Sequence, residues 1–382
     1  MTNTILGAGM LGLPYAVQSS GTIASAFFFV FSCTITMFGL HLLSLSAAKS
    51  KIKKESSYFT LAKETYPRAA ILIELAVALK CFGVSLSYLL VFSSLMTEVA
   101  HFLTTNEIVG NRNFWLGISV ILCVPWCLLK TLNALRFTSY VALVSVAYIF
   151  ILVVYNFLRQ ENIPTPSSST FGPLNITKFF SNLPIFVFAF TCHQNLLPIQ
   201  NELNGNTHKT KIVIITSVLI ALCIYVLIGY CGYFTYGRHI KSNIISNLPQ
   251  DVPTTICRIA VSLLVAFSYP LQIHPCRNSL MSLLLAFPRI HRHPATTYIV
   301  TLCICGITYL LGFLLTDLGI VFSIVGATGS VTLCYLLPGL FYLGMTRGDG
   351  WPIKRILAAS LLAGGLIFMI NSLVWIFSTA VA

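Results

Sequence analysis

The sequence predicts an all-α integral membrane protein whose membrane-spanning helices form two inverted repeats of five, with an eleventh helix added. The first observation is compositional: of 382 residues, 56% are hydrophobic and 9% charged, with a mean hydropathy of +0.85. That is too few charges to solvate a globular surface of this size. The second is that the apolar residues form runs of about 20, the length that crosses a bilayer as a helix. The third is that two runs, five segments apart, contain similar helix-breaking sequences.

Eleven apolar segments follow one another along the chain when about 20 residues are taken as one span. No soluble domain or low-complexity linker divides them, so we expect one domain over residues 1–382. Its first repeat covers about 1–158, its second about 182–345, and an accessory helix about 356–379. The expected segments are 2–18, 22–46, 69–103, 114–129, 137–158, 182–202, 212–235, 255–276, 296–315, 318–343 and 356–379.

The first segment is apolar enough to be buried in the membrane, yet it carries Gly7, Gly9, Gly12 and Pro14. Glycine adds backbone freedom and proline removes a hydrogen-bond donor, so these residues weaken a helix. A broken backbone in a bilayer survives only where it lines protein or a water-filled cavity. We therefore expect a binding site at this break. The six residues before Gly7 rise only about 9 Å against roughly 15 Å for half of a hydrocarbon core. We expect either a preceding segment or a short stub at the inner gate.

The sixth segment is interrupted in a similar way, with Pro184 and Pro198 on either side of the polar run Thr191-Cys192-His193-Gln194-Asn195. Such a run at mid-membrane depth is costly unless it faces a cavity. The alternative is a kinked helix whose polar groups bond to neighbouring backbones. We expect Phe190 and Thr191 to contact a ligand at this break.

The two broken segments end alike, at Leu13-Pro14 and at Leu197-Pro198. The offset of five segments is odd, so the second copy lies upside down relative to the first. In transporters with inverted repeats, half-helix ends of this kind meet near the membrane midplane. Carboxylates favour the amino ends of helices and ammonium groups favour the carbonyl ends, so the pair suits a zwitterionic amino acid.

The formal net charge of +13 comes from basic residues in the short gaps between apolar runs. They do not cluster on one face among aromatics, as nucleic-acid binding requires, so we expect no nucleic acid partner. Most of them lie on one side if the N-terminus is cytosolic, which the positive-inside rule favours. The opposite side then holds only Arg112, Arg159, Lys178, Arg238, Lys241 and Arg258.

The sequon Asn175-Ile176-Thr177 falls in the longest gap, on the side opposite the cytosol. Sequons on that side receive N-linked glycans, so we expect a glycan on Asn175. The C-terminus would lie on the same side as this glycan because the number of segments is odd.

Several motifs together resemble the amino acid/auxin permease family, which includes the sodium-coupled neutral amino acid transporters and the fungal vacuolar amino acid transporters. The resemblance covers nearly the whole chain. The His193-Gln194-Asn195 sequence is most similar to the fungal vacuolar branch, which favours a vacuolar or lysosomal membrane and leaves the plasma membrane open. The matching stretches are 3–16, 80–84 with Tyr88-Leu89, 135–141 and 190–195.

The resemblance implies the LeuT-like fold and coupling of amino acid movement to protons, which we favour, or to sodium, with no bound cofactor. It places Gly7, Ala8 and Gly9 in the unwound segment that contacts the amino acid. Asn3 and Ser268 correspond to cation-binding positions of the sodium-coupled branch. His193 could carry a coupled proton, although a histidine that bonds freed backbone groups is the alternative.

Lys80 lies within the third segment, where a lysine costs about 2.5 kcal/mol or more. We expect it to face a wet cavity; the alternative is snorkelling to the cytosolic surface. Tyr88, two turns further on, could line the substrate pocket or pack against neighbours.

These features favour a secondary transporter of amino acids that works by alternating access. The alternative is a sensor that binds amino acids and signals without significant flux. An enzyme is disfavoured because the ten acidic residues form no convergent catalytic cluster. Cysteine pairs such as Cys123 and Cys127 lack the partner ligands of a metal site, and the sequence names no protein partner.

Overall fold

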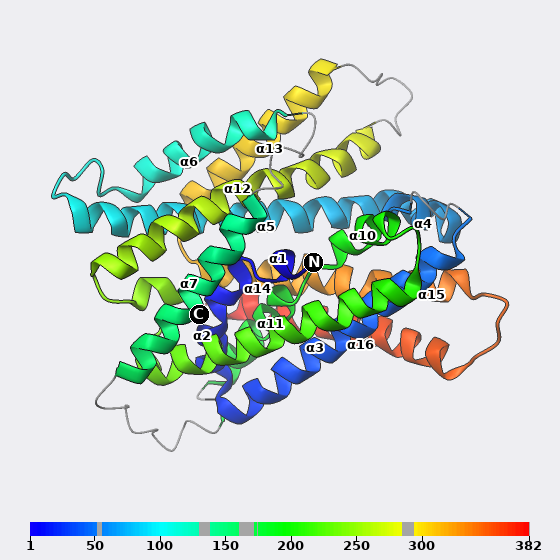
Figure 1. Ribbon diagram of the computed structural model, residues 1–382. Helices are drawn as coiled ribbons and strands as arrows, with labels where there is room; N and C mark the ends of the chain where they lie inside the picture. The colour runs from blue at the N-terminus through cyan, green and yellow to red at the C-terminus, as the bar shows by residue number, and fades with distance from the viewer. Residues whose placement is uncertain (52–55, 130–137, 160–171, 174, 285–293, 382) are drawn as a thin grey trace.

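The computed structural model describes residues 1–51, 56–129, 138–159, 172–173, 175–284 and 294–381 (Figure 1). Within these ranges, eight helices are long and apolar enough to cross a membrane. The helices that contain these spans are α3 (Thr22–Lys49), α5 (Ala70–Leu103), α7 (Thr138–Arg159), α11 (Thr207–Tyr236), α12 (Val252–Leu284), α13 (Pro294–Leu314), the run from α14 (Leu318–Val325) to α15 (Leu337–Met345), and α16 (Ile353–Val381).

The other three predicted segments are shorter or broken helices. The fourth is α6 (Arg112–Cys127), which is apolar and contains Pro125. The first is divided into α1 (Thr2–Ile5), η1 (Ala8–Gly12) and α2 (Leu13–Ser20). The sixth is divided into α9 (Pro184–Ala189), η5 (His193–Asn195) and α10 (Leu196–Glu202), and α8 (Ile176–Asn182) precedes it. All eleven predicted segments therefore coincide with helical elements.

Some elements of the structure were not expected from the sequence. The short helix α4 (Tyr58–Thr65) begins with a capping box, in which Ser57 and Thr60 each bond the other's backbone N–H. The turns η2 (Pro67–Ala69), η6 (Gly237–His239) and η7 (Ile244–Asn247) lie in connections. Two π-helical stretches, η8 (Gly326–Ser330) and η9 (Thr332–Leu336), interrupt the tenth segment.

Polar contacts at one end of the bundle join segment ends that the sequence places on the outer side. Arg112 donates to the carbonyl of Leu315 at 2.9 Å, which ties the start of α6 to the end of α13. The side-chain amide of Gln18 at the end of α2 donates to the carbonyl of Arg238 beyond α11 at 3.4 Å. These contacts agree with the predicted alternation of helix directions.

The opposite end carries its own set of contacts. Lys49 at the end of α3 pairs with Asp349 at 2.6 Å, and Arg347 donates to the carbonyl of Thr65 at 3.1 Å. Of the basic residues that the sequence places on this side, Lys53, Lys54, Lys130, Arg136, Arg289 and Arg292 lie outside the described residues, as does the start of the motif 135–141.

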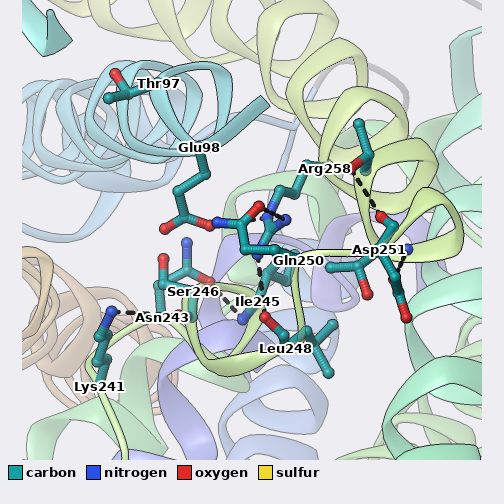
Figure 2. Close-up of polar contacts among 12 residues, drawn as sticks. Thr97, Glu98, Lys241, Asn243, Ile245, Ser246, Leu248, Gln250, Asp251 and Arg258 are labelled. Carbon is teal, nitrogen blue, oxygen red and sulfur yellow. Dashed lines mark hydrogen bonds and ion pairs between the residues drawn. The ribbon is translucent and has the colours of Figure 1, made fainter. Parts of the chain in front are cut away.

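The loop of residues 237–251 lies at the end of the bundle that the sequence places on the outer side, and Arg258 on α12 holds it there (Figure 2). The Arg258 side chain is 1% exposed and donates to the carboxylate of Glu98 on α5 at 2.8 Å. It also donates to the side chain of Gln250 and to the carbonyl of Leu248, each at 3.1 Å. One buried guanidinium thus joins two spans and the loop.

The broken segments lie in the interior of this bundle, with α1 near its middle in Figure 1. Helix α2 packs against α3 and α11, whereas α9 packs against η1 and η8. Helix α5 runs alongside α12 and also contacts η1 and η8. The two breaks are therefore enclosed by long apolar helices.

Candidate substrate-binding site

The two helix breaks lie directly against each other. Helix α1 ends at Ile5, and Gly7 adopts an extended backbone before η1 begins. A Cβ added to Gly9 would lie 2.7 Å from the Cα of Ala189, the last residue of α9. Only glycine permits an approach this close, so the glycine predicted to break the first helix also lets it meet the sixth segment.

Tyr225 on α11 connects the carbonyl ends of both broken helices. Its hydroxyl lies 3.0 Å from the carbonyl oxygen of Ala189 and also bonds to the carbonyl oxygen of Ile5. These residues end α9 and α1, where helix carbonyls lack intrahelical partners. A hydroxyl carries a single hydrogen, so it can satisfy one of the two carbonyls at a time.

A second bridge joins the segments beside the breaks. The side-chain amide of Asn195 in η5 donates to the hydroxyl of Thr4 in α1 at 2.6 Å. Together with the Tyr225 hydroxyl, it holds the first and sixth segments as one unit.

A small buried cavity of about 20 Å³ lies where the breaks meet. Its wall includes Thr4, Gly7, Ala8 and Gly9 from the first segment and Thr191 and Gln194 from the sixth. Long helices contribute the remaining polar wall, with Lys80 and Tyr88 from α5 and Gln272 from α12. A volume of this size holds about one water molecule, so the site is closed in this arrangement.

Two amide oxygens at the cavity have no hydrogen-bond partner within the described residues, namely Oε1 of Gln194 and Oε1 of Gln272. Buried polar atoms are nearly always paired, so these acceptors call for a donor from a ligand or water. The N–H groups of Ala8 and Gly9 begin a helical turn and have no intrahelical acceptor. The cavity therefore offers acceptors and donors to a small polar molecule.

The family model for transmembrane amino acid transporter proteins matches residues 1–382. The chain belongs to this family. Its members are transporters rather than enzymes, and the match confirms the resemblance carried by the sequence motifs.

Three curated relatives support the assignment. Vacuolar amino acid transporter 5 of Schizosaccharomyces pombe is 33% identical over 97% of this chain and 91% of its own length. Vacuolar amino acid transporter 5 of Saccharomyces cerevisiae is 30% identical over 98% of this chain and 95% of its own length. Vacuolar amino acid transporter 6 of the same yeast is 32% identical over 98% of this chain and 96% of its own length.

Most residues predicted to bind the substrate line the cavity of this family member. They are Gly7, Ala8, Gly9, Tyr88 and Thr191. The Thr191 hydroxyl also donates to the carbonyl of Val187 at 2.7 Å. Phe190 lies behind the wall, with its ring centroid 5.0 Å from that of Tyr225. Its ring thus supports the residue that connects the breaks.

None of the three residues predicted for ion coupling belongs to the cavity wall. His193 is 0% exposed; its Nδ1 lies 3.1 Å from the sulfur of Cys334, and its Nε2 has no partner in the described part of the chain. Ser268 is half-buried on α12, one turn before Gln272, and Asn3 belongs to α1. The three side chains come from three different segments.

Lys80 lines the cavity and is 2% exposed, so it does not reach the membrane surface. A Cβ added to Gly329 in η8 would lie 2.6 Å from the Cβ of Lys80. The π-helical stretch therefore packs directly against the lysine stem.

Sequence reasoning missed Tyr225, Thr4 and Gln272. Tyr225 could have been found because it lies inside an apolar span. A buried tyrosine hydroxyl usually has a hydrogen-bond partner, so such a residue indicates a polar group nearby. Gln272 could have been found as an uncharged polar residue within the eighth segment.

Asn175 lies outside the bundle core, as the residue that caps α8. It is exposed, and its Oδ1 accepts from the N–H of Lys178 at 3.1 Å. A glycan attaches to the amide nitrogen, so this cap leaves the attachment atom free to react.

Proposed function

We propose that this chain is a secondary active transporter that moves amino acids across a membrane by alternating access. The observation that carries the proposal is the meeting of two interrupted membrane segments at a closed polar cavity. Broken helices in a bilayer persist where they bind substrate, because their freed backbone groups need partners. The names of the relatives and of the family agree with amino acids as the substrate.

The proposed substrate pose follows the chemistry of the helix ends. The α-carboxylate lies at the N–H groups of Ala8 and Gly9, since helix amino ends carry partial positive charge. The ammonium group donates to the carbonyl ends near Ala189 and to the unpartnered oxygens of Gln194 and Gln272. Thr191 and Tyr88 flank the substrate, and Phe190 supports the wall.

We propose the LeuT-like arrangement of two inverted repeats of five helices for this bundle. The broken segments open the proposed repeats 1–158 and 182–345, and residues 356–379 form the accessory helix. The support is that both broken segments carry their proline early in the second half-helix, at Pro14 in α2 and Pro198 in α10.

Proton coupling is the proposed energy source, with sodium as the alternative. His193 is the proposed proton carrier, and Asn3 with Ser268 would serve a cation.

The proposed location is the vacuolar membrane, with the N-terminus in the cytosol. The relatives from both yeasts are named vacuolar transporters. The orientation follows from the excess of basic residues on one side.

Uptake by proteoliposomes tests the proposal. The purified chain is reconstituted and given a panel of labelled amino acids while the pH and sodium gradients are varied independently. We expect uptake that collapses when the proton gradient is dissipated and that persists without sodium. Flux independent of both gradients would remove the coupling mechanism, and binding without flux would favour the sensor.

A further inference from the structure

Lys80 is the charged side chain among the described residues that line the cavity. It is one of the largest side chains to be fully buried in the described part of the chain. The first atoms of its side chain pack directly against η8, because a Cβ added to Gly329 would lie 2.6 Å from the Lys80 Cβ. The base of the lysine side chain is therefore fixed beside the cavity.

The ammonium has no carboxylate partner among the described side chains. The two ion pairs formed there join Lys49 to Asp349 and Arg258 to Glu98, at opposite ends of the bundle. Glu74 lies six residues before Lys80 on α5, about 120° away around the helix, whereas paired residues lie three or four apart.

The ionisable groups that interact electrostatically with Lys80 are thiols and an imidazole. They are Cys81 on the same helix, Cys192 and His193 at the break of the sixth segment, and Cys334 in η9. Thiols and imidazoles are mostly uncharged or positive near neutral pH. The elements packed around Lys80 thus supply no fixed negative charge to balance its ammonium.

The helix ends at the cavity already suit both charged groups of an amino acid backbone before Lys80 is counted. The N–H groups of Ala8 and Gly9 at the start of η1 have no intrahelical acceptor, and the carbonyl ends of α1 and α9 lie at the same cavity. One α-carboxylate satisfies those N–H groups, and one α-ammonium satisfies the carbonyl ends. A buried ammonium left without a partner is costly, so a second anionic group on the substrate would stabilise it.

We propose that Lys80 binds a side-chain carboxylate of the substrate, so that the cavity selects acidic amino acids, aspartate or glutamate. This inference rests on the proposed transport function and names its substrate class. The substrate then brings two carboxylates, one for the helix amino ends and one for Lys80. A glutamine of the same shape would leave the ammonium unpaired.

Competition between labelled glutamate and glutamine in proteoliposomes tests the assignment. We expect the wild-type chain to take up glutamate in preference to glutamine. Lys80→Met keeps the length of the side chain and removes its charge. It should lower the glutamate-to-glutamine uptake ratio at least about 30-fold, as loss of one partner of a buried charge pair does. Lys80→Arg should retain the preference for glutamate.

Lys49→Met is the matched control, because it removes an exposed lysine at the end of α3. Its uptake ratio should equal that of the wild type. Thermal stabilisation of the wild-type protein by glutamate but not by glutamine supplies a test that needs no variant. Equal stabilisation by both, or an unchanged ratio in Lys80→Met, would overturn the assignment of Lys80. Uptake of glutamine with no uptake of glutamate would overturn it too, whereas absence of all amino acid uptake would instead count against the transport function.

Discussion

The hydroxyl oxygen of Tyr225 lies 3.0 Å from the carbonyl oxygen of Ala189 and also bonds to the carbonyl of Ile5. One side chain of α11 therefore holds the ends of two broken helices. Because its single hydrogen can serve only one carbonyl at a time, the other is open to a second donor. An ammonium group of a substrate is such a donor, so binding would complete a hydrogen-bond set that the empty site leaves incomplete.

Tyr225→Phe should weaken both stability and transport. It leaves two buried carbonyls without the hydroxyl, which costs about 1 to 3 kcal/mol. We expect a lower melting temperature in detergent and, for about 1.4 kcal/mol lost from the closed arrangement, an uptake rate about tenfold lower. Tyr230→Phe on the same helix is the control, because its hydroxyl bonds to Thr22 near the start of α3. Equal uptake by the two variants would contradict the role of Tyr225.

Alanine at three glycines should produce a graded loss of transport. Gly9→Ala places a Cβ 2.7 Å from the Cα of Ala189, so the two broken segments must move apart and uptake should be abolished. Gly7→Ala places its Cβ 3.5 Å from the Tyr88 hydroxyl, an ordinary contact, and should reduce substrate affinity by narrowing the cavity. Gly117→Ala on α6 meets no atom within 4 Å and should behave as wild type. Uptake rates and surface expression measure this order; full activity in Gly9→Ala would refute the close approach.

Glu98→Gln should destabilise the protein more than removal of an exposed charge does. It leaves the Arg258 guanidinium, which is 1% exposed, without its counter-ion, at a cost of about 3 kcal/mol or more. Asp349→Asn breaks the exposed pair with Lys49, and its cost should stay under about 1 kcal/mol. Melting temperatures of the two variants in detergent compare these effects. Similar shifts would mean that Arg258 finds another partner when the outer loop rearranges.

A glycan on Asn175 would report the orientation of the chain. Expression in a eukaryotic host should give a band that shifts down on treatment with an endoglycosidase. Thr177→Ala removes the sequon while the Asn175 cap of α8 remains, so it should abolish the shift without loss of stability. A shift that persists in this variant would place the glycan elsewhere.

Much of the architecture could be predicted because a helix buried in a membrane needs about 20 apolar residues, which the local sequence shows directly. The apolar runs locate the spans, and Gly7 and Pro198 mark the breaks, since a bilayer tolerates such residues only under narrow conditions. Gly7, Gly9 and Thr191 lie in the cavity wall as residues of these breaks. Ala8 and Tyr88 lie there too, and it is the family motifs containing them that indicate these two residues.

The features that the sequence did not predict depend on packing between segments that are distant in the chain. Tyr225 becomes important only when α11 brings it to the ends of α1 and α9. The loop 237–251 reads as a polar connection, yet it is held by a buried arginine eight residues after Gln250. The π-helical stretches follow from the fit between the tenth segment and α5, and hydropathy carries no sign of them.

The two π-helical stretches wind the tenth segment more loosely than an α-helix where it packs against Lys80. A π-type hydrogen bond spans one more residue than an α-type bond, and such stretches occur frequently at functional sites. Conversion of one such turn to an α turn would displace the following helix by about one residue, a rise of about 1.5 Å. Such a conversion between Gly326 and Leu336 would move α15 relative to the cavity, and the backbone would stay helical, as a bilayer requires. A change in the winding of the tenth segment is therefore a way to alter the packing around the cavity while Tyr225 and Asn195 keep the two broken segments joined.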